Sequence, residues 1–368
     1  MTTSNPAADG AAAAADAKQA FAERLFGDAL GMMNLAGVYL GTTLGLYEAM
    51  RDGVAVTSSE LAERTSVTER YAREWLEHQA ANGVLVLVEP SDDPGARRFA
   101  LPQAHAEVLA DRDDLDFLGW LGGGAVAGFS RLPDVAEAFR TGRGVPWEAF
   151  GDGMRFMQGD ANRPLFLHAL GQEFLPNVPD VHARLSEGAR VAEVGSGLGW
   201  AAIGLARAYP NVTVDGYDID GPSVEYATQH AQEHGVADRV AFHAVDASTV
   251  AGQYDLVTAF ECIHDMPRPV EVLSTMRSMV APGGAVIVMD ERADEAFQAP
   301  ASDVDRYLYG FSLLVCLPDG LSTEGSVGTG TVMRPATFRQ YALDAGFREV
   351  EVLEDLDHPF FRFYRLHP

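Results

Sequence analysis

The chain has 368 residues, which is long for one compact core and indicates two domains with connecting helices. Hydrophobic residues make up 47% and charged residues 22%, as in an ordinary globular protein, and 53 acidic against 27 basic residues give a net charge of -26. So negative a chain repels phosphate backbones and anionic lipid headgroups, which argues against nucleic acid and membrane surfaces as partners.

The N-terminal segment opens with an Ala-rich stretch, residues 1–18, which we expect to be a disordered tail. A helical pattern is predicted over residues 21–50, because apolar residues recur there at helical spacing and cover a wide face. Such a face fits a dimer surface or packing within the chain, and the spacing favours neither. The apolar residues are Phe21, Leu25, Phe26, Leu30, Met33, Leu35, Val38, Leu40 and Leu44.

Residues 19–110 carry the pattern of a winged helix. Thr57, followed three residues later by Glu60, has the form of a capping box at the start of a helix. A second helix is predicted over residues 68–81, and two strands joined by a Pro/Asp/Gly turn are predicted between residues 84 and 101. Two helices followed by a hairpin are typical of a winged-helix domain.

DNA binding is the obvious function of a winged helix, and a DNA-binding regulator is one hypothesis for this chain. The predicted second helix argues against it, because its mixed charges do not make a phosphate-binding face. We therefore expect the domain to form a homodimer and one wall of a substrate pocket. The charged residues of that helix are Glu69, Arg70, Arg73, Glu74 and Glu77.

Residues 111–180 are predicted to be a mostly helical linker that forms a further wall of the pocket. We expect a flexible break at the glycine-rich residues 119–124. Aromatic and methionine side chains are frequent in this segment, and their spacing does not separate core from pocket lining. Among them, Met157 is a candidate for contact with the substrate.

The C-terminal part, residues 181–368, alternates strands with helices, which predicts an α/β fold with a mainly parallel sheet. Two further strands at the end of the chain fit an antiparallel hairpin at one edge of this sheet. The predicted strands are Arg190–Val194, Val212–Tyr217, Val240–Ala244, Tyr254–Phe260, Ala285–Asp290, Arg348–Glu354 and Phe360–Leu366.

The first strand of this part runs into a glycine-rich turn and then a helix, a combination that forms a cradle for a ligand. The turn contains Gly195, Ser196, Gly197 and Gly199. A dinucleotide-binding turn would need its third glycine at the position of Trp200, so the spacing argues against a pyrophosphate ligand.

Carboxylates follow the next two strands. Asp218 ends the second strand about 20 residues beyond the glycines, where a carboxylate can bind a ribose diol, and Ile219 follows it. Asp246 follows the third strand, where it can accept a hydrogen bond from an adenine amino group, and Ala247 is its neighbour. Together with the glycine turn, these positions predict a nucleoside-containing cofactor.

Glu193 completes the pattern E-x-G-x-G-x-G, which resembles motif I of class I S-adenosylmethionine-dependent methyltransferases. The resemblance implies S-adenosylmethionine as cofactor and S-adenosylhomocysteine as product. It also implies a Rossmann-like sheet of seven strands, and it adds Phe260 and Glu261 at the end of the fourth strand to the cofactor site.

His264 follows the fourth strand, at the carboxyl edge where ligands bind in parallel sheets. Methyl transfer requires contact between nucleophile and methyl group and usually removal of a proton, a task that suits histidine. The winged helix, motif I and His264-Asp265 together resemble small-molecule O-methyltransferases of plants and of actinobacterial secondary metabolism. That resemblance implies that His264 is the general base, steadied by Asp290 with Glu291 as neighbour. Met266 departs from the tryptophan of the plant pattern.

An insertion, residues 300–332, separates the fifth strand from the last helix. In the resembling family this region covers the substrate. Tyr307, Phe311 and Cys316 are therefore candidates for substrate contact, with ordinary core packing as the alternative.

The chain is thus predicted to methylate a small molecule, in particular a natural-product hydroxyl. The alternative is a methyltransferase fold that uses bound S-adenosylmethionine for hydroxylation, decarboxylation or ring formation. We expect a cytoplasmic protein, because neither a transmembrane span nor a signal peptide is evident. No metal is expected, because Cys262 and Cys316 show neither CxxC spacing nor a Cys/His cluster.

Overall fold

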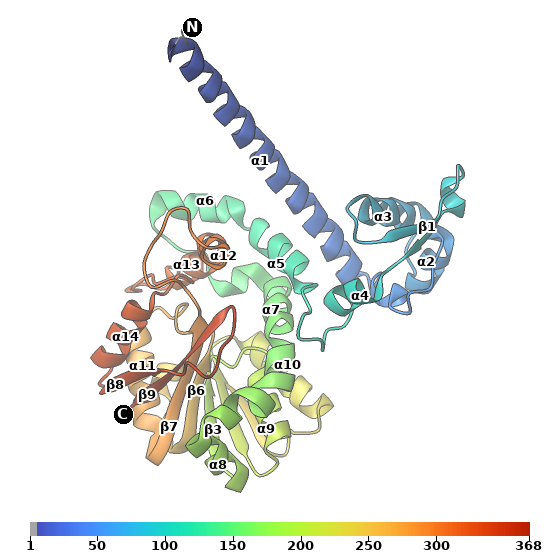
Figure 1. Ribbon diagram of the computed structural model, residues 1–368. Coiled ribbons are helices and arrows are strands. Elements are labelled where there is room, and N and C mark those ends of the chain that lie inside the picture. The colour runs from blue at the N-terminus through green and yellow to red at the C-terminus, as the bar shows by residue number, and fades with distance from the viewer. Residues whose placement is uncertain (1–5) are drawn as a thin grey trace. The chain divides into compact units, whose positions relative to one another are not determined.

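The computed structural model describes residues 6–368 (Figure 1). The chain divides into two compact units, one comprising residues up to 111 together with 116–126, the other comprising residues 112–115 and 127–368. The predicted winged-helix domain, residues 19–110, lies within the first unit. Part of the segment predicted as a linker, residues 116–126, also belongs to that unit.

The first unit has the predicted order of helices and hairpin. Thr57 caps α2 with the expected reciprocal bonds to Glu60, and the two strands pair antiparallel. The elements are α1 (Pro6–Thr43), η1 (Glu48–Met50), α2 (Ser58–Thr65), α3 (Glu69–Ala81), β1 (Val86–Glu89), η2 (Pro94–Ala96), β2 (Arg98–Ala100) and α4 (Gln103–Leu109).

Two predictions for this part of the chain are wrong. Residues 6–18 are not a disordered tail but the first turns of α1, because alanine has the highest helix propensity of all residues; residues 1–5 lie outside the described part. Residues 119–124 are not a flexible break, since Gly122 lies inside α5 (Trp120–Phe129). A Cβ on Gly122 would approach the Tyr39 backbone nitrogen to 2.5 Å, so glycine there permits close helix packing.

The core of the first unit lies where α1, α2 and α3 meet. Trp75 donates a hydrogen bond of 2.9 Å to the Gly37 carbonyl and packs edge-on against Tyr47. Earlier in α1, apolar side chains remain exposed in the single chain, Phe26 by 66%. The others on this exposed surface are Phe21, Leu25, Leu30, Met32 and Met33.

The second unit is built on a seven-stranded sheet in the order β5-β4-β3-β6-β7-β9-β8, with only β9 and β8 antiparallel to their neighbours. This confirms the predicted Rossmann-like sheet with its C-terminal hairpin. The strands are β3 (Arg190–Val194), β4 (Thr213–Asp218), β5 (Val240–Ala244), β6 (Tyr254–Phe260), β7 (Val280–Glu291), β8 (Glu349–Val352) and β9 (Phe361–His367).

Helices cover both faces of this sheet (Figure 1). One core contains apolar residues of α8, η3 and α9, and the other contains those of α11 and α14. The helices and turns of the unit are α6 (Leu132–Thr141), α7 (Trp147–Pro164), the π-helix η3 (Leu165–Phe174), η4 (Leu175–Asn177), α8 (Pro179–Glu187), α9 (Trp200–Ala208), α10 (Gly221–Glu233), η5 (Ala247–Thr249), α11 (Pro269–Met279), α12 (Asp303–Phe311), the π-helical η6 (Ser312–Cys316), α13 (Leu317–Gly320) and α14 (Pro335–Asp344).

The predicted insertion thus forms α12, η6 and α13 between the fifth parallel strand, β7, and α14. No helix within residues 6–368 combines the length and the apolar character needed to cross a membrane. Since all five parallel strands end at one edge, the turns after β3, β4, β5, β6 and β7 gather there, and this edge is where a ligand site is expected.

Candidate active site

The turn between β3 and α9 holds its glycines in backbone conformations that other residues rarely adopt. The φ angles of Gly195, Gly197 and Gly199 are 70°, 48° and 81°. A Cβ on Gly195 would lie 2.7 Å from Cys262 Sγ, and one on Gly199 would lie 2.5 Å from Phe242. At Gly197, by contrast, a Cβ would meet open space, so a ligand can approach the backbone there.

Asp218, at the end of β4, is bound to this turn. Its Oδ2 accepts a hydrogen bond of 2.7 Å from the Gly197 backbone N–H, and its Oδ1 accepts one of 2.9 Å from the Asp220 N–H. Burial raises the pKa of the Asp218 carboxyl, although both backbone bonds favour its charged form. The fold therefore places Asp218, which is predicted to bind a ribose diol, directly beside the glycine turn.

Glu193, the first residue of the predicted motif, is a buried carboxylate without a cationic partner. Its side chain is 2% exposed, and its Oε2 finds no hydrogen-bond partner within residues 6–368. Burial raises the pKa of this carboxyl to about 8. The Ser196 hydroxyl, next in the turn, is also buried without a partner among these residues. Such unsatisfied groups fit a polar, positively charged ligand.

A pocket with about 510 Å³ of empty space opens beside the turn. The predicted residues Glu193, Gly195, Ser196, Gly197, Phe260 and Glu261 all line it. The remaining lining residues are Trp147, Arg155, Gln158, Gly159, Asn162, Phe166, Leu198, Trp200 and Ser223. A whole wall of this pocket comes from α7 and η3, which the sequence analysis assigned no cofactor role.

Side chains of the α7 wall form hydrogen bonds with Glu261. The residue adopts a left-handed backbone conformation, with φ of 54°, directly after β6. Burial raises the pKa of its carboxyl to about 7, while hydrogen bonds from Asn162 and Gln158 act in the opposite direction. The two amides stand one helical turn apart on α7, a spacing that is too common in helices to signal a site by itself.

Arg155 ties α7 to the start of α10. Its guanidinium is 6% exposed and donates two hydrogen bonds to Asp220, of 2.6 and 2.8 Å. Asp220 in turn caps α10 by accepting a hydrogen bond from the Ser223 backbone N–H. This paired arrangement is among the strong charge-assisted contacts of proteins and fixes one wall of the pocket. No sequence pattern predicts this pair, because Arg155 and Asp220 are 65 residues apart in the chain.

The remaining predicted cofactor residues lie at the ends of β4 and β5. Ile219 is 77% exposed beside Asp218. Asp246 caps η5 by accepting a hydrogen bond of 2.9 Å from the Ser248 N–H, and Ala247 begins that turn. These residues do not line the 510 Å³ pocket described above, and their contact with an adenosine group stays a prediction.

His264 lies in the turn after β6 and is 2% exposed. Its Nδ1 is 2.7 Å from Asp290 Oδ1 and 2.8 Å from Glu291 Oε2, both at the end of β7. Its Nε2 is 3.1 Å from Asp265 Oδ1, a partner that the sequence analysis did not identify. The imidazole is thus held at both nitrogens, and the two predicted acidic neighbours lie on its Nδ1 side.

The three carboxylates control the protonation of this group. Burial opposes a charged imidazole, but Asp265, Glu291 and Asp290 together raise the pKa of His264 well above its usual value. Despite its burial, Asp290 has a lowered pKa because of the imidazolium, whereas burial raises the pKa of Glu291. The imidazolium and the Asp290 carboxylate therefore favour each other's charged forms, whereas burial favours the neutral form of Glu291.

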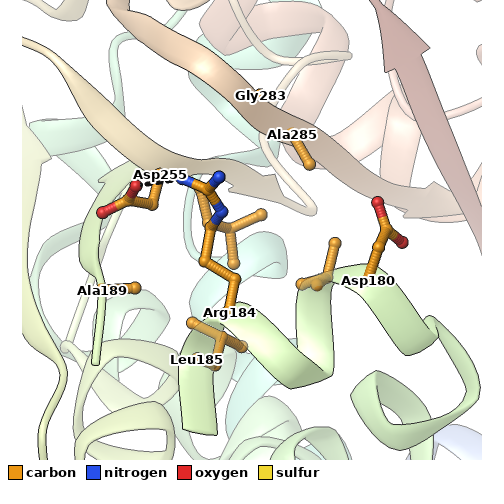
Figure 2. Close-up of a pocket in the computed structure, with 9 residues that line it drawn as sticks. Asp180, Arg184, Leu185, Ala189, Asp255, Gly283 and Ala285 are labelled. Carbon is orange, nitrogen blue, oxygen red and sulfur yellow. Dashed lines mark hydrogen bonds and ion pairs between the residues drawn. The ribbon is translucent and has the colours of Figure 1, made fainter. Parts of the chain in front are cut away.

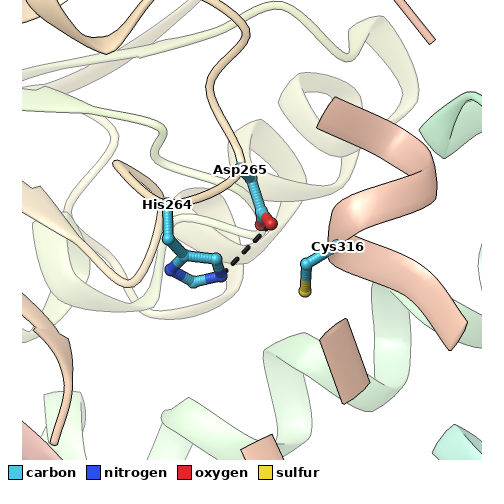
Figure 3. Close-up of side chains that lie close together, drawn as sticks. All are labelled: His264, Asp265 and Cys316. Atoms are coloured by element: carbon cyan, nitrogen blue, oxygen red, sulfur yellow. Dashed lines mark ion pairs between the residues drawn. The ribbon is translucent and has the colours of Figure 1, made fainter. Parts of the chain in front are cut away.

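The insertion contributes one residue to this cluster. Cys316, at the end of η6, lies with its thiol on the same side of the imidazole as Asp265 (Figure 3). Tyr307 packs against Phe311 at 5.3 Å between ring centroids, and the nearby Glu261 carboxylate contributes to its raised pKa, for which burial is the main cause. Met157 is buried within α7, and its contact with a substrate stays a prediction.

A smaller cavity, with about 240 Å³ of empty space, lies at the opposite ends of the strands (Figure 2). It is bordered by the residues at the amino ends of β3, β6 and β7 and by α8. Its main charges are already paired, since Arg184 binds Asp255 and Asp180 binds Arg365. We assign the candidate active site to the other edge, where the buried polar groups are unpaired.

Two family models match this chain. A methyltransferase domain matches residues 185–331, and an Rv2258c-like winged HTH domain matches residues 28–111. Among curated proteins, the ubiquinone biosynthesis O-methyltransferase of Burkholderia pseudomallei is 27% identical over 194 residues, which cover 51% of this chain and 76% of that protein. The corresponding protein of Bordetella avium is 36% identical over 124 residues, which cover 33% of this chain and 49% of its own.

The chain is an S-adenosylmethionine-dependent methyltransferase. Solved structures share its fold along nearly the whole length. Human N-acetylserotonin methyltransferase, in complex with S-adenosylmethionine, has a TM-score of 0.69 at 17% identity and covers 94% of this chain and 97% of its own. The mitomycin 7-O-methyltransferase has a TM-score of 0.66 at 19% identity and covers 96% of this chain and all of its own.

The pocket of this methyltransferase fits the cofactor. Glu193 offers a buried, unpaired carboxylate to a ligand that carries an ammonium and a sulfonium, and Gly197 leaves room beside the backbone. Asp218 presents its carboxylate at the same turn. The ionised carboxylates of these residues would carry the negative charge that attracts a cationic cofactor. The geometry of the turn therefore supports the cofactor site that motif I predicts.

Proposed function

We propose that the methyltransferase transfers a methyl group to a hydroxyl oxygen of a small natural product, with His264 as general base. The observation that carries this proposal is the bracing of His264 by Asp290 at the carboxyl edge of the sheet. A carboxylate that accepts the Nδ1 proton fixes the tautomer and leaves Nε2 to exchange a proton with a substrate. The O-methyltransferases among the relatives and fold neighbours agree with an oxygen acceptor.

Bound S-adenosylmethionine supplies the methyl group on a positively charged sulfur. The chain's own task is to orient the acceptor hydroxyl and to take its proton at His264 Nε2. Asp290 then holds the resulting imidazolium at Nδ1, as its distance of 2.7 Å allows. Tyr307, Phe311 and Cys316, from the insertion, are the residues we propose to contact the acceptor.

Protonation sets a condition on this mechanism. The three carboxylates around His264 raise its pKa, so the resting imidazole carries a proton that must leave before the group acts as a base. Methyl transfer should therefore increase with pH along a limb centred above the ordinary histidine value.

The N-terminal unit has a separate role in this proposal. We infer that it forms the interface of a homodimer, because the apolar side chains of α1 between Phe21 and Met33 are exposed in the single chain. On α3, Arg70 pairs with Glu74 and Arg73 with Glu69. Paired arginines leave little free positive charge for phosphates, which supports dimerisation over DNA binding.

The test compares His264→Ala with His367→Ala, a change on β9 outside the cluster. Each purified protein is titrated with S-adenosylhomocysteine by calorimetry, then incubated with S-adenosylmethionine and a panel of phenols and hydroxylated heterocycles. We expect both variants to bind S-adenosylhomocysteine like wild type, and only His264→Ala to lose about 10²- to 10⁴-fold in methylation rate. A fully active His264→Ala would overturn the assignment of the base.

A further inference from the structure

The side chains of His264, Asp265 and Cys316 form a group that no role described so far accounts for in full. One nitrogen, one carboxylate oxygen and one sulfur of these residues all lie within 4.8 Å of one another (Figure 3). His264 is 2% and Cys316 8% exposed, whereas the Asp265 side chain is 31% exposed. The Asp265 oxygen that faces His264 is buried as well, so all three donor atoms are shielded from solvent in this structure.

The surroundings of His264 prepare its Nε2 to bind a cation. Asp290 Oδ1, 2.7 Å away, accepts the proton of Nδ1 and so directs the lone pair of a neutral imidazole to Nε2. Histidines that bind metals almost always donate their other ring N–H to a carboxylate in this way. The Nδ1 side itself is closed to a cation, because that nitrogen already donates to Asp290.

The donor set identifies the class of cation. An imidazole nitrogen, a carboxylate and a thiolate are the three ligand types of Zn²⁺ sites, and the soft sulfur disfavours Mg²⁺ and Ca²⁺. Tetrahedral bonds of about 2.0–2.3 Å to such atoms bring neighbouring ligands to within about 4 Å of one another. The three donor atoms already lie within 4.8 Å of one another, so each pair needs to approach by no more than about 1 Å to reach that spacing.

We propose that His264 Nε2, Asp265 and Cys316 Sγ form a binding site for Zn²⁺ or a similar thiophilic divalent cation, which inhibits methyl transfer. Binding forms one bond to each of the three ligands. It displaces the thiol proton of Cys316 and the Nε2 proton of His264 to solvent, with no change in oxidation state. The inhibition, though not the binding, rests on the proposed role of His264, because the cation occupies the nitrogen that would accept the substrate proton.

The experiment uses the full chain after treatment with a chelator and titrates it with Co²⁺, a spectroscopic substitute for Zn²⁺. A thiolate ligand gives Co²⁺ a near-ultraviolet charge-transfer band. We expect this band in wild type and in the matched control Cys262→Ser, and its loss in Cys316→Ser. A second variant, Asp265→Asn, should keep the band and bind Zn²⁺ about tenfold more weakly in competition with Co²⁺. Circular dichroism establishes that each variant is folded.

Two results would overturn the site: no band in wild type at a cobalt concentration above that of the protein, or an unchanged band in Cys316→Ser. Inhibition is measured separately, as methylation of an accepted hydroxyl compound with and without Zn²⁺. The rate of each protein with Zn²⁺ is compared with its own rate without Zn²⁺. We expect Zn²⁺ to inhibit wild type, and Cys316→Ser to need an at least about tenfold higher Zn²⁺ concentration for the same fractional inhibition. A band without inhibition would overturn the inhibitory role alone, whereas an active, chelator-treated His264→Ala would overturn the base and not the site.

Discussion

Two groups of buried carboxylates lie at the carboxyl edge of the same sheet, and they differ in how their charge is balanced. At the glycine turn, Glu193 has no cationic neighbour among residues 6–368, and burial raises its pKa to about 8. After β6, Asp290 faces the imidazole of His264, which lowers the pKa of that carboxyl despite its burial. One group lacks a counter-ion, and the other contains its own.

This difference separates two tasks. An unpaired buried carboxylate is costly unless a proton or a cationic ligand neutralises it, so the glycine turn is suited to bind a positively charged cofactor. A carboxylate beside an imidazole instead stabilises the positive charge that forms when the other ring nitrogen takes up a proton, so the His264 cluster is suited to accept a proton. The following experiments perturb one group and leave the other intact.

The largest effect is expected at Asp218, whose carboxylate lies beside the turn. Asp218→Ala should weaken binding of S-adenosylhomocysteine by about tenfold to a hundredfold, because hydrogen bonds to charged groups are worth about 1.5–3 kcal/mol. Calorimetric titration gives the affinity, and Asp238→Ala, which removes an exposed carboxylate, serves as the control. A change below about twofold would argue against Asp218 as a cofactor ligand.

An intermediate effect is expected at Asp265. Its carboxylate raises the pKa of His264, so Asp265→Asn should lower that pKa. A general base works above its pKa, and the acid limb of the kcat/KM profile should therefore move to lower pH by about one unit. The profile is measured with a chelator present, and Glu271→Gln, an exposed change on α11, is the control. A limb that stays in place or moves upward contradicts the proposed base.

A smaller effect is expected at Glu193. Because its pKa is raised to about 8, this carboxyl is protonated near neutral pH, and a cationic ligand binds better to the ionised form. Affinity for S-adenosylhomocysteine should increase by up to about tenfold per pH unit below pH 8 and then level off. Glu193→Gln should bind more weakly at high pH and lose this dependence. The test is the same calorimetric titration of wild type and Glu193→Gln at several pH values. If the affinity changes equally with pH in both proteins, Glu193 does not have the proposed role.

Much of the fold could be read from local patterns. The parallel strands β3, β5 and β6 begin and end where alternating and apolar runs predicted them, and the capping box at Thr57 is formed as expected. The tail and the glycine break were predicted wrongly for one reason: composition was taken as flexibility. Alanine favours a helix even in a featureless stretch, and Gly122 serves close packing inside α5.

In the site, too, some residues were predicted from local sequence patterns and others were brought together only by the fold. Motif I is a continuous segment, so its glycine spacing and Glu193 already indicated the cofactor, and the carboxylate of Asp218 follows at the end of the neighbouring strand. The α7 wall carries no comparable signal. In the sequence, Gln158 and Asn162 look like any other polar helix residues. Only the packing of α7 in the folded chain brings their side chains within hydrogen-bond distance of Glu261.

The sequence by itself determined the sheet, the cofactor turn and the position of His264, because periodicity and glycine spacing act over a few neighbouring residues. Only the tertiary structure decided that Asp265 and Cys316 join the expected Asp290 around one imidazole. Such contacts depend on which strand ends and insertions meet in space. The raised pKa of His264 follows from that meeting, since desolvation and charge act through distance and not through sequence.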